Sequence, residues 1–196
     1  MKRICVFCGS SPGVRPLYAA ATRELGQTLV ELGIDLVYGG AGIGLMGILA
    51  QTVLDGGGRV TGVIPRVLAE KEVAFARLED LRIVESMHER KALMASLSDG
   101  FVALPGGIGT IEEFVEVLTW AQLGIHCKPC GLMNTGGYYE RLLGFFDHMA
   151  AEGFVRPDTR GRVLVEYDPA LLLMKMNLYR SPPAAKDKPV VRLNDT

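Results

Sequence analysis

The sequence contains no long hydrophobic run, and this absence argues against a membrane-spanning helix. No window of the 196 residues approaches the roughly 18 apolar residues that a membrane span needs. The N-terminus, MKRICVFCGSSPG, has a short apolar stretch that ends at a glycine turn, too short for the core of a secretory signal peptide. We therefore expect a cytoplasmic protein that does not interact with membranes.

The chain also lacks an excess of charge of either sign. It has 21 basic and 22 acidic residues, a net charge of −1, and no run of lysine or arginine. Proteins that bind nucleic acid through bulk electrostatics carry a basic patch or stripe. We therefore expect small molecules or other protein chains as partners, and no nucleic acid.

Cysteine is scarce, although the four cysteines form two C-x-x-C pairs. If residues 2–7 form a strand, Cys5 and Cys8 point to opposite faces of the sheet and cannot share a metal ion. The second pair, in HCKPC (126–130), follows an expected helix and enters a strand, whereas a redox pair needs its first thiol at a helix N-terminus. We predict reduced structural thiols and no metal site.

Several catalytic motifs are missing as well. The sequence has no H-E-x-x-H, no G-x-S-x-G and no Walker lysine, so the standard parts for zinc proteolysis, serine esterase chemistry and P-loop hydrolysis are absent.

What the chain does contain is a regular alternation of short apolar segments and segments with helical periodicity. Continuous apolar strands separated by helices are typical of a parallel sheet covered on both faces. We predict an α/β fold, a Rossmann-like doubly wound and mostly parallel sheet, in one domain over residues 1–179 with a flexible tail over 180–196. The expected strands are 2–7, 34–38, 59–64, 81–84, 100–104, 129–133 and 162–166, and the expected helices are 16–32, 44–55, 86–98, 110–125, 137–152 and 168–178.

Three expected strands end in glycine-containing turns: CGSSPG (8–13), YGGAGIGLMG (38–47) and PGGIGT (105–110). In a doubly wound sheet these turns gather along one edge. Glycine turns that open helices present free backbone N–H groups to an anion. One phosphate-bearing ligand could therefore contact all three turns.

Two other interpretations of these glycine turns stay open at the level of sequence. Thr110 and Glu113 have the spacing of a helix capping box, in which Glu113 has only a structural role. The segment Gly42–Gly47 spells G-x-G-x-x-G, a dinucleotide fingerprint, but the next strand ends without the acid that holds the ribose of NAD. Arg66 at that strand end leaves NADP as a formal alternative.

The segment MHERK (87–91) begins a helix that should lie beside the PGG turn. Its cations, Arg90 and Lys91, either lie on a solvated helix surface or face a bound anion. With a phosphate on PGGIGT, a sugar would lie beside Glu113. Cleavage of an N-glycosidic bond develops positive charge at C1′, which a carboxylate stabilises while it orients or deprotonates water.

The segments MHERK, PGGIGTIEE (105–113) and TWAQLGIHCKP (119–129) together resemble the LONELY GUY family, the cytokinin riboside 5′-monophosphate phosphoribohydrolases with the motif PGGxGTxxE. The likeness extends to about residue 178. It implies Arg90 and Glu113 as the catalytic pair. Further residues that it implies in substrate binding are Gly9, Ser10, Glu72, Met87, Lys91, Gly106, Gly107, Gly109, Thr110, Glu112 and Thr119.

The resemblance implies hydrolysis of a nucleoside 5′-monophosphate, prenylated AMP or AMP, to free base and ribose 5-phosphate. It further implies no cofactor, no metal and a homodimer. Family members often carry the label "possible lysine decarboxylase", but the lysines here lack a setting for pyridoxal phosphate. A non-catalytic nucleotide carrier of the same fold is the alternative function, and the choice of base stays open.

Overall fold

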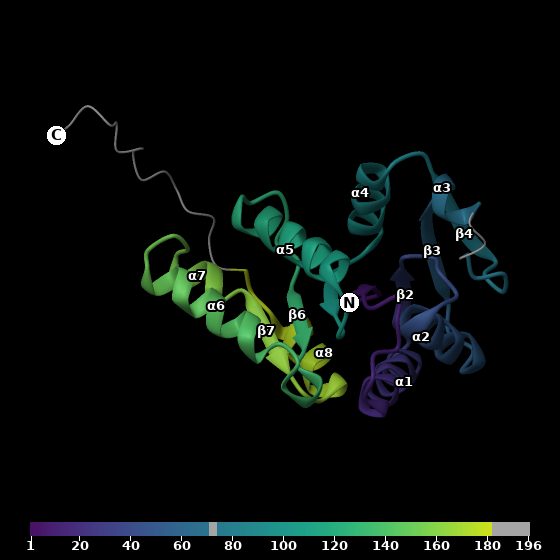
Figure 1. Ribbon diagram of the computed structural model, residues 1–196, viewed down its shortest axis with the longest axis horizontal. Coiled ribbons are helices and arrows are strands. Elements are labelled where there is room, and N and C mark those ends of the chain that lie inside the picture. Colours follow the sequence, from purple (N-terminus) through teal and green to yellow (C-terminus); the bar gives the residue numbers. More distant parts are fainter. Residues whose placement is uncertain (71–73, 182–196) are drawn as a thin grey trace.

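The computed structural model describes residues 1–70 and 74–181, and it forms a single α/β domain (Figure 1). The strands are β1 (Arg3–Phe7), β2 (Asp35–Tyr38), β3 (Val60–Pro65), β4 (Asp80–Val84), β5 (Gly100–Ala103), β6 (Cys130–Met133) and β7 (Val163–Glu166). The helices are α1 (Pro16–Glu31), α2 (Gly44–Asp55), α3 (Arg66–Ala69), α4 (Met87–Leu97), α5 (Ile108–Gln122), the 3₁₀ turn η1 (Thr135–Gly137), α6 (Glu140–Ala151), α7 (Pro157–Arg160) and α8 (Pro169–Leu178).

The strands form one sheet in the order β4-β3-β2-β1-β5-β6-β7, and every pairing in it is parallel. Strands β5 and β6 are buried along their whole length, and β2 is buried after its first residue, because helices cover both faces of the sheet. The strand order reverses between β1 and β5. In open α/β sheets this switch point is where ligands bind, outside the carboxyl ends of the strands.

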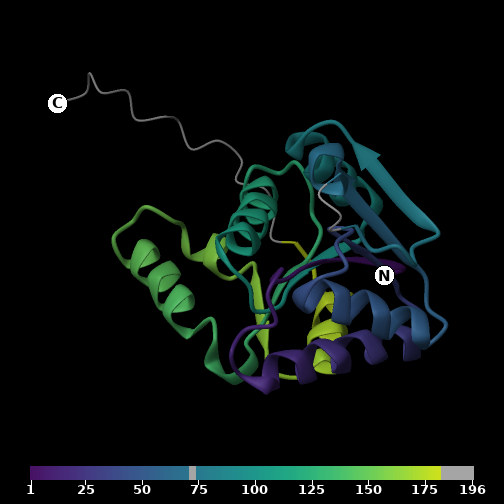
Figure 2. The same ribbon diagram turned by 45° about the vertical axis from the view of Figure 1, so that its right-hand side comes forward.

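Helices pack on both faces of the sheet. One hydrophobic cluster joins it to α1, α2 and α8, and a second joins it to α4, α5 and α6. Figure 2 shows α1 in purple and α2 in blue side by side, with α8 in yellow next to them. Cys5 lies in the second cluster and Cys8 in the first, so the predicted division of these thiols between opposite faces is confirmed.

The predicted order of helices and strands is confirmed, with differences at the boundaries. Helix α5 begins at Ile108, two residues earlier than expected, and α6 begins at Glu140, three residues later, because η1 precedes it. The short helices α3 and α7 were not expected. Among the described residues, no helix is long and apolar enough to cross a membrane.

Two predictions concern residues that lie outside this description. Glu72 falls in the segment 71–73, and most of the expected tail, from 182 to 196, is also outside the described residues.

Candidate active site

The three glycine turns meet at the carboxyl edge of the sheet, as predicted. Gly9, after β1, joins them, because its N–H donates to the Pro105 carbonyl at 3.1 Å and its carbonyl accepts from the Leu45 N–H at 3.0 Å. Gly44 has a φ of 57°, and an added Cβ there would lie 2.2 Å from the backbone carbon of Ser10. The turns after β1, β2 and β5 therefore pack directly on one another.

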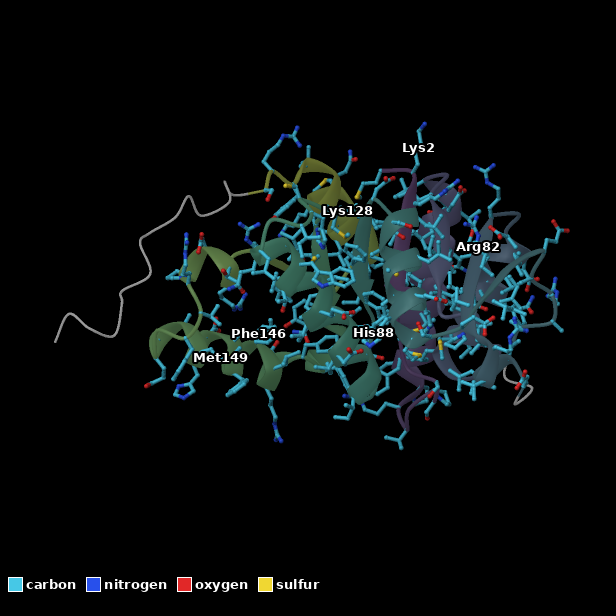
Figure 3. All side chains as sticks on the ribbon, turned by 90° about the horizontal axis from the view of Figure 1, so that it is seen from above. Lys2, Arg82, His88, Lys128, Phe146 and Met149 are labelled. Carbon is cyan, nitrogen blue, oxygen red and sulfur yellow. The ribbon has the colours of Figure 1, made fainter. Side chains whose placement is uncertain are left out.

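A cleft of about 280 Å³ opens between these turns at the switch point of the sheet. In Figure 3, Lys2 and Lys128, which precede β1 and β6 at the amino edge of the sheet, lie nearer the top of the view, and His88, which follows β4, lies below them. The cleft belongs to the carboxyl edge, and its lining residues are Gly9, Ser10, Ser11, Pro12, Gly13, Tyr18, Leu45, Pro105, Gly106, Gly107 and Tyr138.

The start of α5 supplies an anion site on this cleft. The helix begins at Ile108 after Gly107, and no side chain caps it. The first N–H groups of a helix have no acceptor within it, and the helix dipole adds partial positive charge at that point. A Cβ added at Gly107 or Gly109 would meet no atom within 4 Å, so both glycines border open space. A phosphate can approach this backbone closely.

Arg90 and Glu113 form a buried ion pair between α4 and α5. The Arg90 Nη1 lies 2.6 Å from the Glu113 Oε1, and the Arg90 Nε donates to the Val63 carbonyl at 3.1 Å. The residues are only 8% and 9% exposed. Arg90 comes from the second turn of α4 and Glu113 from the second turn of α5. The structure thus brings together two residues that are 23 positions apart.

Gly39 makes room for this arginine. A Cβ added at Gly39 would lie 2.2 Å from the Arg90 Nη2 and 3.1 Å from the Met46 Sδ. Gly39 follows β2, so the second glycine turn contributes space for the guanidinium rather than only backbone amides.

Burial raises the pKa of the Glu113 carboxyl above its usual value. The nearby Arg90 guanidinium counteracts this effect, while the Glu112 carboxylate adds to it. Neither Glu113 nor Arg90 lines the cleft itself. A buried carboxyl group whose pKa is shifted in this direction and that has a specific charged partner is nevertheless typical of a functional site.

Two structural alternatives from the sequence are wrong. Glu113 is not part of a capping box with Thr110, because the N-cap is Gly107 and Glu113 bonds to Arg90. Thr110 instead lies in the first turn, where its Oγ1 would be 2.1 Å from a Cβ at Gly106. Arg90 does not lie on a solvated helix surface, because it is buried against Val63.

The other expected residues lie at different distances from the cleft. Ser10 lines it, and Met87 is a half-exposed residue in the first turn of α4. Lys91 bonds to the Glu112 Oε1 at 2.7 Å and to the Glu116 Oε1 at 3.1 Å. Thr119 lines a different groove of about 180 Å³ between α5 and α6, which includes Phe146 (Figure 3).

Sequence reasoning missed Tyr138 and the role of Gly39. Tyr138 lines the cleft and donates its phenol proton to the Gly106 carbonyl at 2.5 Å. The segment NTGGYYE (134–140) carries a recognisable turn signal after a strand, but nothing in it indicates the distant carbonyl that Tyr138 contacts. Sequence reasoning treats Gly39 as one of the turn glycines that present backbone N–H groups, whereas its Cβ position faces the Arg90 side chain.

Fold and site together define a class: a Rossmann-like α/β protein with a cleft and an uncapped helix start at the switch point of its sheet, and with a buried arginine–glutamate pair on the two helices α4 and α5. A family model described as "Possible lysine decarboxylase" matches residues 46–176. The chain is 55% identical to the probable cytokinin riboside 5′-monophosphate phosphoribohydrolase LOGL1 of Oryza sativa subsp. japonica, over 90% of this chain and 79% of that protein.

Other curated relatives agree with this match. The chain is 53% identical to the cytokinin riboside 5′-monophosphate phosphoribohydrolase LOG1 of Arabidopsis thaliana, over 89% of this chain and 81% of the relative. It is 51% identical to the cytokinin riboside 5′-monophosphate phosphoribohydrolase LOG of Oryza sativa subsp. japonica, over 91% of this chain and 74% of that protein. The chain belongs to the LONELY GUY family.

Solved structures share the fold at lower identity. The molybdenum cofactor carrier protein of Chlamydomonas reinhardtii matches with a TM-score of 0.68 and 22% identity, over 90% of this chain and 97% of that chain. The molybdenum cofactor binding protein of Rippkaea orientalis matches with a TM-score of 0.67 and 18% identity, over 91% of this chain and 99% of that chain. These similarities establish the architecture alone.

The lysines in the described part of the chain do not fit the pyridoxal phosphate that amino-acid decarboxylation normally uses. Within residues 1–70 and 74–181, no lysine lines the cleft. Lys91 is bound by two carboxylates, and the Lys128 Nζ donates to the Ala95 carbonyl at 2.7 Å. A Schiff-base lysine needs a free amine that can reach the cofactor.

Proposed function

We propose that the protein hydrolyses the N-glycosidic bond of an adenine nucleoside 5′-monophosphate, N6-prenylated or plain, to free base and ribose 5-phosphate. Names of close relatives that specify cytokinin riboside 5′-monophosphate phosphoribohydrolase support this function. The single structural observation that carries it is the buried Arg90–Glu113 pair beside an uncapped helix start.

In this reaction the 5′-phosphate sits on the first turn of α5, at Gly106, Gly107 and Gly109, with Thr110 and Ser10 beside it. Backbone amides and the helix dipole stabilise its charge. The phosphate fixes the position of the nucleotide, so that the ribose extends toward Glu113.

Glu113 and Arg90 act at C1′. As the bond from C1′ to the base nitrogen breaks, positive charge develops on the sugar, and the Glu113 carboxylate stabilises it. The same carboxylate orients a water, whose oxygen bonds to C1′ while the base leaves with a proton. Arg90 holds the carboxylate through the 2.6 Å contact. In the proposed complex its guanidinium also binds the ribose hydroxyls, which keeps the sugar and the carboxylate in register.

The other expected residues act around this centre. Lys91 holds Glu112 at the edge of the site, and Met87 borders the nucleotide one turn before Arg90. The proposed contacts of Glu72 and Thr119 with substrate rest on the family resemblance alone.

The test is an assay for free base with AMP and, separately, isopentenyladenosine 5′-monophosphate, in buffer with EDTA. Chromatography should resolve adenine or isopentenyladenine, and the ratio of the two rates gives the base preference. Bound nucleotide with no release of either base would favour a non-catalytic carrier, the second function that this fold allows.

We also propose a homodimer. Its support is the group of large apolar side chains that are exposed on and directly after α5 and α6. Among them, Leu123 is 67% exposed, Phe145 is 57% exposed and Phe154 is 85% exposed. Light scattering after size exclusion should give twice the 21.2 kDa chain mass. The cytoplasmic location stays a prediction from the sequence.

A further inference from the structure

Two neighbouring tyrosines after β6 reach back to the PGG turn. The Tyr138 phenol donates to the Gly106 carbonyl at 2.5 Å, and the Tyr139 phenol donates to the Leu104 carbonyl at 2.6 Å. They differ in burial, since Tyr139 is 1% exposed and Tyr138 is 42% exposed. Tyr139 therefore belongs to the core, whereas Tyr138 forms part of the cleft wall.

The loop that carries Tyr138 is itself held in place. The Asn134 Oδ1 accepts the Tyr139 N–H at 2.8 Å, and the Asn134 Nδ2 donates to Glu140 at 2.6 Å and to the Tyr167 hydroxyl at 3.1 Å. The Tyr138 ring also packs edge-on against Tyr139, with ring centroids 5.1 Å apart. The phenol is thus presented to Gly106 from a fixed position.

The contact matters because of the peptide unit that it holds. A trans peptide is planar, so the Gly106 carbonyl and the Gly107 N–H point in opposite directions. With glycine on both sides, this peptide can rotate more freely than one between larger residues. Within residues 1–70 and 74–181 the Gly106 carbonyl accepts no other hydrogen bond. The Tyr138 phenol therefore determines where the Gly107 N–H points.

We propose that Tyr138 is a positioning residue of the phosphate cradle, which fixes the peptide between Gly106 and Gly107 so that the Gly107 N–H faces the 5′-phosphate. This inference rests on the proposed function, because it assumes that the cradle at the start of α5 holds that phosphate.

The test compares Tyr138→Phe with the unaltered protein. Phenylalanine keeps the ring between Tyr18 and Tyr139 and removes only the hydroxyl. A net hydrogen bond of ordinary strength corresponds to a roughly three- to tenfold change in binding. We expect that rise in the Kd of ribose 5-phosphate, measured by calorimetry, the same rise in KM, and a kcat within about twofold.

Adenosine, which has no phosphate, separates positioning from general damage to the site. Its inhibition constant should not change in Tyr138→Phe. Tyr38→Phe is the matched control, because the Tyr38 hydroxyl is buried and has no hydrogen-bond partner among the described residues. It should leave both ligands unaffected.

Equal weakening of ribose 5-phosphate and adenosine, or no change in either, would overturn the role of Tyr138. If the unaltered protein binds ribose 5-phosphate but releases no base, the proposed function fails, and the two Kd values still decide the role of Tyr138. If it does not bind ribose 5-phosphate at all, the cradle and the inference both fail.

Discussion

Replacement of Glu113 by glutamine tests the centre of the site with the smallest change in shape. Glutamine keeps an oxygen that can accept the Arg90 Nη1 bond, now 2.6 Å long, and removes only the charge. A unit charge about 4 Å from the developing cation contributes about 4 kcal/mol at an effective dielectric constant of about 20. Arg90 neutralises part of that charge, so about 3 kcal/mol is a reasonable expectation.

At about 1.4 kcal/mol per factor of ten, this loss lowers turnover by at least ~100-fold. Binding of ribose 5-phosphate should stay within about tenfold, because the phosphate rests on backbone amides. The assay is release of free base, with calorimetry for binding and circular dichroism for folding. Glu85→Gln is the matched control, because it breaks an exposed pair with Arg66 whose contact is 2.7 Å. Turnover close to normal in a folded Glu113→Gln protein would refute the reasoning.

Three further predictions concern the same pair. Arg90→Ala leaves Glu113 buried without its partner; we expect ~100-fold slower base release, weaker nucleotide binding and a loss of about 3 kcal/mol in unfolding free energy by urea titration. A purely structural change, with kinetics intact, would contradict this. Gly39→Ala places a Cβ 2.2 Å from the Arg90 Nη2, so base release should fall at least ~10-fold, and a crystal structure should show the guanidinium displaced. A guanidinium in its original position would show that Gly39 does not position Arg90. Because burial raises the pKa of Glu113 and its carboxylate is the active form, kcat should fall as the pH drops through that raised pKa, above the usual glutamate range. A rate that stays constant down to the usual glutamate pKa would exclude Glu113 as the titrating group.

Local signals predicted the fold and the position of the cleft well. Helices, strands and glycine turns each follow from residues close together in the chain, and parallel β-α alternation then places the turns on one edge. The prediction for α2 matched the observed bounds, Gly44–Asp55. The spacing of Thr110 and Glu113 fits a capping box, but α5 already begins at Ile108, so Thr110 lies inside the helix and cannot cap it.

Contacts between distant segments could not be predicted in the same way. The fit of Arg90 against Gly39 and the bond from Tyr138 to Gly106 each depend on how two loops face each other. Sequence reasoning treats glycines in a turn as equivalent, whereas the structure gives each a different neighbour. The resemblance supplied the pair of Arg90 and Glu113, and the geometry then explained how the two residues meet.

The different surroundings of these glycines give substitution data on this protein a specific meaning. Gly44 and Gly106 have no room for a Cβ because atoms of neighbouring turns or of the first turn of α5 lie within 3 Å, so intolerance of substitution there reports on the architecture of the edge. Gly107 and Gly109 have open space, and alanine at either position meets no protein atom within 4 Å. Variants at these two positions that fold normally but lose activity would therefore outline the volume that the bound nucleotide occupies.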